Sequence, residues 1–487
     1  MMRTVAVPFC GLQDGVHPAT WGQTHTWTAL EVSQPPDQWN LVRYFTLPQL
    51  TDLDAVTSAW SALVGRHVAL RTRLFRRHDE TRWQRVVSSG TADMEVHGCP
   101  SGEDPQHFAD AILSEYFSSA DRAIAPEDWP ARLLVFVTAG GDAYGALLAC
   151  SHTVLDGWSF SLLIGEFARL LAGEKETDLP SVTHTPVDRA GIEAEGHYRK
   201  RSDRGVAYWK SVLEVSPSSL FPSVRHASDS EPIKRVRLRS SHFAEAAATL
   251  PGRLGISHTA MFFGAAAYAL CRLTGNGSIT VQIQSSNRFE PRLKQYVGAL
   301  AQASIVRIEP VGRTFYDLAR EAHVLLLRAY FHGQYDQRDV DRRIKALDQD
   351  RDEAIDLSCV FNDVTFGRLT RLGTGSAPFP GEGDFREISW GDARARDDLV
   401  KCNVLIVDDL DVPRKCGAPV VDLSRELSRD ELRDELRDQL VVRPAVEVQA
   451  DARYVSPGEM ISVLTDMDSV LSRAILADVE LDCSAGL

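Results

Sequence analysis

The most constraining stretch of this chain runs from an apolar segment through a polar loop into an amphipathic segment. Residues 144–150 are the short apolar run that is typical of a buried strand. After Ser159, apolar residues recur every three or four positions, the spacing of one helical face: Phe160, Leu163, Ile164, Phe167, Leu170 and Leu171. The loop between them carries His152, Asp156 and Gly157. We therefore predict that a buried strand and a packed helix hold this loop at the edge of a rigid core.

The three residue types in this loop can do different chemistry. An imidazole such as that of His152 exchanges a proton near neutral pH. An ionised Asp156 can orient a neighbouring group, and Gly157 lets a ligand approach the backbone closely. A histidine followed four residues later by an aspartate is nevertheless common by chance. The spacing alone therefore leaves a catalytic and a purely structural His152 both open.

A wider set of motifs resembles one known family. Residues 151–159, Ser-His-Thr-Val-Leu-Asp-Gly-Trp-Ser, resemble the HHxxxDGWS signature of the condensation domains of nonribosomal peptide synthesis, with Ser151 in place of the first histidine. Residues 66–75 resemble the RHxxLRTRF motif of the same family. Residues 297–307 are similar to its VGxFVNTxxxR motif, with Leu300 and Gln302 at the Phe and Asn positions. The motifs occur in the family's order.

The resemblance and the length of the chain imply a fold in two parts. At 487 residues the chain is long for a single core. The family implies an α/β (α+β, two-layer) fold with two chloramphenicol acetyltransferase-like lobes in a V around a central tunnel. We expect an N-terminal lobe at 1–185, a connecting segment at 186–205 and a C-terminal lobe at 206–487. A charged helical insertion is expected at 411–443, either as a solvated surface helix or as a docking surface for a partner.

Local patterns predict several elements and their ends. Apolar runs at 132–137 and 144–150, joined by a Gly-Gly-Asp turn, predict a hairpin. Thr51, Ser257 and Ser456 are predicted to cap helices. Alternating residues predict strands at 279–284 and 446–454.

Composition narrows the possible partners and location. The net charge of −14 disfavours nucleic acid and anionic membrane surfaces as partners. The eight cysteines contain no CxxC pair, so neither a zinc site nor a disulfide framework is expected. The sequence has no apolar run long enough for a membrane span and no signal-peptide pattern, so we expect a cytoplasmic protein without a metal site.

The resemblance also assigns roles to residues of the loop. His152 corresponds to the family's second histidine and is the expected catalytic residue. It would act as a general base, or it would orient the nucleophile and stabilise a charged intermediate. Asp156 is expected to be structural, paired with an arginine of the 66–75 segment; Arg71 is the first choice and Arg66 the other candidate. Ser151 is expected to replace the family's first histidine by hydrogen bonding to nearby backbone.

Further residues are expected to line the substrate channel. Their positions in motifs of the family assign this role: Gly157, Trp158, Gln302, Ser358 and Asn362.

The resemblance finally implies a function. No adenylation or carrier segment appears in the chain, so we expect a freestanding condensation enzyme. It would transfer an acyl or aminoacyl group from a phosphopantetheine thioester to a small-molecule amine or alcohol, with no bound cofactor. The thioester would be carried in trans by an acyl or peptidyl carrier protein, which is often acidic, so a local basic patch is expected. An acyl-CoA-dependent acyltransferase and a catalytically inert docking protein are the alternatives.

Overall fold

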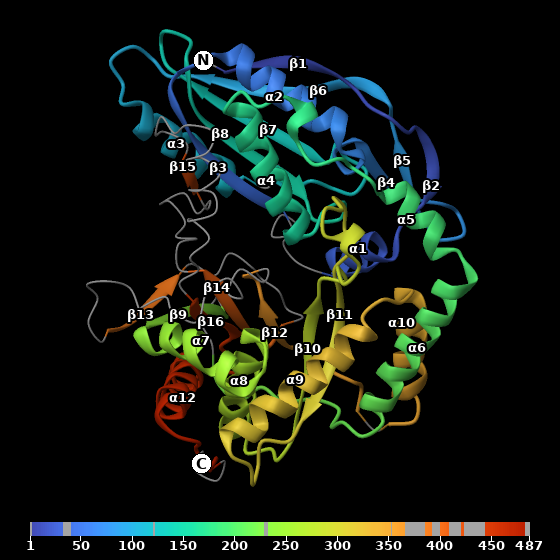
Figure 1. The fold of residues 1–487 in the computed structure, drawn as a ribbon, viewed down its shortest axis with the longest axis vertical. Helices are drawn as coiled ribbons and strands as arrows, with labels where there is room; N and C mark the ends of the chain where they lie inside the picture. The colour runs from blue at the N-terminus through green and yellow to red at the C-terminus, as the bar shows by residue number, and fades with distance from the viewer. Residues whose placement is uncertain are drawn as a thin grey trace.

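Two lobes, each built on one mixed β-sheet, make up the molecule (Figure 1). The computed structural model describes residues 2–32, 40–119, 122–227, 232–351, 353–365, 385–391, 400–408, 420–422 and 444–482. Helices and mixed sheets occur together in both lobes, so the α/β fold class predicted from the sequence is confirmed. The N-terminus lies at the far end of one lobe and the C-terminus at the far end of the other (Figure 1).

The first lobe contains a six-stranded sheet in the order β1-β6-β7-β8-β3-β15. Its strands are β1 (Met2–Cys10), β3 (Asn40–Thr51), β6 (Ser89–Gly98), β7 (Ala131–Val137), β8 (Ala143–Ser151) and β15 (Val420–Asp422). Strands β7 and β8 pair antiparallel, which confirms the predicted hairpin. Its helices are α2 (Leu53–Arg66), α3 (Pro105–Ser118) and α4 (Gly157–Leu171). A three-stranded sheet lies beside it, formed by β2 (Gly15–Pro18), β5 (Arg82–Val86) and β4 (Thr72–Arg76).

The second lobe contains a seven-stranded sheet in the order β11-β10-β12-β14-β16-β9-β13. Its strands are β9 (Ile233–Ser240), β10 (Ile279–Ser285), β11 (Gln302–Ile308), β12 (Cys359–Asp363), β13 (Arg386–Gly391), β14 (Cys402–Asp408) and β16 (Pro444–Asp451). Its helices are α7 (Ser241–Leu254), α8 (His258–Thr274), α9 (Phe315–Phe331), α10 (Gln337–Asp348) and α12 (Pro457–Leu476). Ser257 and Ser456 cap α8 and α12 as predicted, with the side chain of each accepting a backbone N–H.

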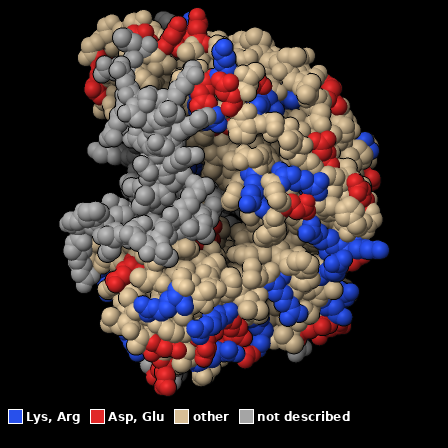
Figure 2. Space-filling model, viewed as in Figure 1, with Lys and Arg blue, Asp and Glu red and all other residues tan. Residues whose placement is uncertain are grey.

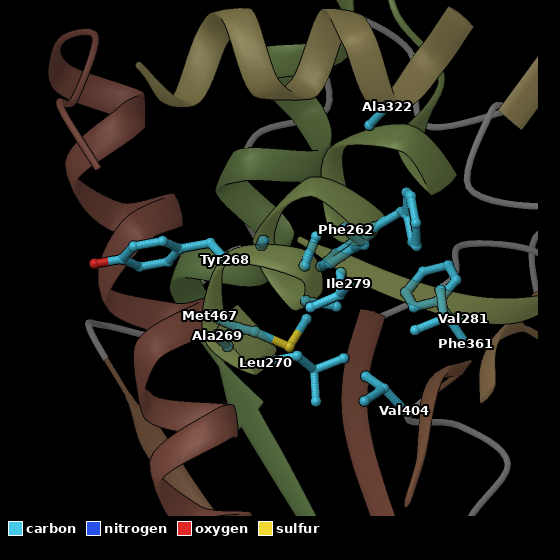
Figure 3. Packing of buried hydrophobic residues seen from close by; sticks show 14 of the residues in the cluster. Phe262, Tyr268, Ala269, Leu270, Ile279, Val281, Ala322, Phe361, Val404 and Met467 are labelled. Atoms are coloured by element: carbon cyan, nitrogen blue, oxygen red, sulfur yellow. The ribbon is translucent and has the colours of Figure 1, made fainter. Parts of the chain in front are cut away.

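The core of the second lobe surrounds α8, which is apolar on nearly every side. Residues of α8, the sheet and α12 meet there (Figure 3): Phe262, Leu270, Ile279, Val281, Phe361, Val404 and Met467. A helix that is hydrophobic all round is buried in a large core, and α8 follows that rule. No single helix of the described residues has the length and hydropathy of a membrane span; α7 and α8 have them only together, with a bend of 108° between them.

Residues 186–205, the predicted connection, are helical. They form α5 (Pro186–Glu193) and the first half of α6 (Gly196–Leu213), which run along one side of the molecule between the lobes (Figure 1). Arg189 and Glu193 form a buried ion pair at 2.6 Å, and Glu193 also accepts the backbone N–H of Trp21 at 2.7 Å. Buried polar contacts thus attach this segment to the rest of the fold.

Two segments cross from one lobe to the other. Strand β15 comes late in the chain but pairs parallel with β3 in the first sheet. Helix α1 (Trp21–Val32) is the first helix of the described residues. It lies between the lobes and packs against β11 and α10 (Figure 1). The predicted charged helix within 411–443 lies outside the described residues.

One predicted cap is wrong. Thr51 ends strand β3, and Asp52 is the N-cap of α2, where its carboxylate accepts the N–H of Asp54. A carboxylate also stabilises the positive end of a helix, which a threonine hydroxyl does less well.

Candidate active site

His152 lies in the turn between β8 and α4, where the two lobes meet. Strand β8 is buried along most of its length, and α4 packs into the same core through Phe160, Leu163 and Phe167. From the second lobe, the N–H of Ala299 donates to the carbonyl of Val154 in this turn at 3.0 Å. The predicted strand, loop and helix are therefore present, and the loop contacts both lobes.

Asp156 fixes this loop through an ion pair with Arg288 of the second lobe. The two guanidinium nitrogens of Arg288 donate to the two oxygens of Asp156 at 2.7 and 2.9 Å. Asp156 also caps α4 by accepting the N–H of Ser159, and it accepts the N–H groups of Leu300 and Ala301 at 2.9 and 3.0 Å. Burial alone would raise the pKa of Asp156, but Arg288 and these donors hold it below its ordinary value.

The predicted pairing of Asp156 with Arg71 or Arg66 is wrong. Arg71 is buried and donates to backbone carbonyls of its own lobe, including Val64 at 3.1 Å and Leu12 at 2.8 Å. Arg66 donates to Glu166 of α4 at 2.9 Å, and His67 contacts the same carboxylate at 2.7 Å. The 66–75 segment therefore holds the body of α4, and an arginine of the other lobe holds its first turn.

The turn after β10 directs Arg288 toward Asp156. Asn287 is fully buried with φ +56°, in the left-handed region that Asn tolerates better than most residues. Its amide donates to the carbonyls of Leu300 and Gly333 at 3.0 and 2.8 Å and accepts the hydroxyl of Ser285 at 2.8 Å. The sequence signal for this turn is the Asn-Arg pair that follows the predicted strand at 279–284 after two serines.

Ser151 is buried at the end of β8. Its hydroxyl donates to the carbonyl of Ile124 at 3.4 Å and lies 2.8 Å from the hydroxyl of Thr153. Its own N–H donates to the carbonyl of Pro130 at 2.8 Å. The Ser151 hydroxyl therefore hydrogen-bonds to nearby backbone, and its replacement of a structural histidine stays a prediction.

His152 lies in an environment that favours its neutral form. Burial lowers its pKa below the ordinary value, although Asp156 and nearby backbone act in the opposite direction. A second histidine, His25 of α1, is close enough to influence it electrostatically. A neutral imidazole is the form that can accept a proton.

A cavity of about 230 Å³ lies beside the loop. Its lining includes three of the predicted channel residues, namely Gly157, Trp158 and Asn362, together with Arg288 and Tyr330. Gln302 and Ser358 are not in this lining. Gln302 is buried and donates to the carbonyl of Tyr335 at 2.8 Å, while the backbone N–H of Ser358 donates to Asp356.

A larger cavity of about 630 Å³ is lined in part by α1. Elements of both lobes line it, including α1, the β4–β5 turn, α5, α6 and α10. Lys and Arg side chains gather over α6 and α10 beside it (Figure 2), among them Arg199, Lys200, Arg204, Arg338 and Arg342. The chain thus has a local basic surface despite its net negative charge.

Known proteins resemble this chain over most of its length. The family model of the condensation domain matches residues 13–373. A probable non-canonical nonribosomal peptide synthetase of Salinispora arenicola, CymA, is 25% identical over 328 residues, which cover 65% of this chain and 4% of that protein. The chain spans between 2% and 30% of the length of such curated relatives.

Solved structures share the fold at low sequence identity. The condensation domain of the Monacolin K polyketide synthase MokA has a TM-score of 0.67 at 15% identity, over 96% of this chain and 99% of that one. The epimerization domain of tyrocidine synthetase B has a TM-score of 0.66 at 13% identity, over 96% and 98%. The fold alone therefore does not separate condensation from epimerization. The family model, which covers well over half of the chain, shows that this protein belongs to the condensation-domain family.

Proposed function

We propose that this protein transfers an acyl or aminoacyl group from a carrier-protein thioester to an amine or hydroxyl acceptor, and that His152 is its catalytic residue. The observation that carries the proposal is the position of His152. A buried ion pair between the lobes, Asp156 with Arg288, holds its loop, and burial lowers the pKa of its imidazole, which favours the neutral form. Condensation domains of peptide and polyketide systems form amide or ester bonds, which is the chemistry such a base can assist.

The two cavities suggest one entrance for each substrate. We assign the smaller cavity to the thioester, because Gly157 and the first turn of α4 line it. N–H groups in a first helical turn have no acceptor within the helix and can stabilise a developing oxyanion. We assign the larger cavity to the acceptor, because its volume of about 630 Å³ can hold a whole small molecule.

The transfer then proceeds by attack and elimination. The acceptor N–H or O–H attacks the thioester carbonyl, so that the new C–N or C–O bond forms while the C–S bond breaks. His152 accepts the proton of the nucleophile and returns it to the departing thiolate, so that amide or ester and free thiol are the products. Holding both substrates in line lowers the entropic part of the barrier.

Intact-protein mass spectrometry tests the proposal. Acyl-loaded carrier proteins and acyl-CoAs are each incubated with a panel of amines and alcohols, with the parent and His152→Ala. His107→Ala is the matched control, because His107 is exposed on α3. Acyl loss from the carrier that requires acceptor and His152 supports the proposal. Loss from CoA alone would favour the acyl-CoA alternative, and no loss from either donor would favour an inert docking protein.

A further inference from the structure

The larger cavity contains a carboxylate that has no cationic partner. Asp341 of α10 is half-buried in its lining. One oxygen of Asp341 accepts the side-chain N–H of Gln337 at 2.7 Å. Among the described residues, no lysine or arginine forms an ion pair with it. Arg82, Lys345 and His25 are near enough to act on it electrostatically, but burial still raises the pKa of Asp341 above its ordinary value.

The cations that line the cavity are paired with other carboxylates. Arg82 and Arg76 both contact Glu31. Arg199 and Arg338, at the outer rim, both contact Asp336. Two other carboxylates of the lining also have arginine partners, Glu80 with Arg76 and Glu193 with Arg189. Asp79 is exposed at the surface, so Asp341 is the half-buried carboxylate of this lining without an arginine or lysine partner among the described residues.

A chain of hydrogen bonds runs from Asp341 through Gln337 to His25 of α1. The backbone N–H of Ala303 donates to Nε2 of His25 at 3.2 Å, so the ring proton of His25 is on Nδ1. Nδ1 then donates to Gln337 at 2.6 Å, and Gln337 donates to Asp341. His25 is within electrostatic reach of both Asp341 and His152. His25 therefore lies near both the carboxylate of Asp341 and the imidazole of His152.

From this arrangement we infer that the acceptor is a small molecule with a cationic group, an ammonium or guanidinium, in addition to its nucleophile. Asp341 binds the cation in the larger cavity, and the nucleophile extends past His25 toward His152. Trp21 and Trp83 give the lining apolar surface for the part of the molecule between the two groups, although Arg77 already covers one face of Trp83. The inference rests on the proposed acyl transfer for the identity of the bound molecule as acceptor.

Calorimetry with a matched pair of probes tests the site without turnover. Benzylguanidinium and benzylurea have nearly the same shape and differ in charge. The parent should bind benzylguanidinium at least tenfold more tightly, a difference of about 1.4 kcal/mol. Asp341→Asn should abolish that preference, and Asp341→Glu should retain part of it. Asp339→Asn, on the same helix but outside the lining, should leave it unchanged.

Two results would overturn the inference: equal binding of both probes by the parent, or an undiminished preference in a folded Asp341→Asn variant. A comparison of turnover separates this inference from the proposed function. If acyl transfer occurs with equal KM for cationic and neutral acceptors, the inference fails and the proposed function stands. If the binding preference is found and no donor is consumed, the proposed function fails and the cation site stands.

Discussion

Replacement of Arg288 by methionine tests how the active loop is held. The substitution removes the guanidinium but leaves an unbranched, uncharged side chain in its place. The Asp156 carboxylate, at 3% exposure, then stays buried without its cationic partner. Breaking a buried pair by removing one partner costs about 3–5 kcal/mol. Asp156 keeps three backbone N–H donors, from Ser159, Leu300 and Ala301, so we expect the lower end, about 3 kcal/mol.

Thermal melting measures this loss, with Arg292→Met as the matched control. Arg292 belongs to the same loop but is half-exposed and pairs with Glu290, so its loss should cost less than about 1 kcal/mol. Arg288→Met should lower Tm by roughly 3 °C, because the unfolding entropy of a chain of 487 residues is about 1 kcal/mol/K. The double variant with Asp156→Asn should lose less than the sum of its two single variants, because the two side chains interact directly.

The pH dependence of the loss separates charge from packing. In the parent, the pKa of Asp156 lies below its ordinary value, so its stabilising contribution is complete at pH 4.5 and above and is lost only as pH falls through that depressed pKa. In Arg288→Met the buried carboxyl would gain a proton as pH falls, which relieves the unpaired charge. The difference in Tm should therefore narrow between pH 7 and pH 4.5. A constant difference, or an equal loss in Arg292→Met, would refute the ion-pair argument.

Other predictions concern the base, the helix, the turn and the surface. Burial lowers the pKa of His152, so turnover should be flat around pH 7 and fall only below about pH 6.5, as pH–rate profiles would show; a midpoint above 7 would contradict this. Glu166→Gln should destabilise the fold by about 1–3 kcal/mol in thermal melts, since Arg66 and His67 both lose their carboxylate partner; an unchanged Tm would argue against that anchor. Asn287→Ala should cost about 1–2 kcal/mol more than Asn287→Gly, because only glycine takes the left-handed conformation without strain; equal melting temperatures would exclude it. Charge reversal at Lys200 and Arg342 should leave the KM for the carrier-borne donor unchanged, because the donor is assigned to the smaller cavity. A large rise in that KM would assign the donor to the larger cavity instead.

The elements around the site could be predicted from the sequence because local patterns determine them. The apolar run of β8 and the helical spacing of α4 depend only on neighbouring residues. The caps at Ser257 and Ser456 are local for the same reason. His152 could be singled out only because a family motif surrounds it. A histidine four residues before an aspartate is common by chance and does not by itself indicate a catalytic residue.

The partner of Asp156 could not be predicted in the same way. The 66–75 segment offered several arginines, and a sequence gives no distance between any of them and the loop. Arg288 lies 132 residues after Asp156, in the other lobe, and it reaches the site through the left-handed turn at Asn287. Gln302 and Ser358 do not line the smaller cavity, and the sequence could not have shown this, because a position next to a strand end does not say which side chain faces a given cavity.

Helix α4 links these observations, because each of its halves is held by a different part of the chain. Glu166, in its later half, is bound by Arg66 and His67 within the first lobe. Asp156, at its first turn, is bound by Arg288 of the second lobe. Any change in the angle between the lobes must then either break the Asp156–Arg288 pair or move the first turn of α4 together with the second lobe. The loop of His152 lies directly before that turn, so the geometry of the base depends on how the lobes are placed.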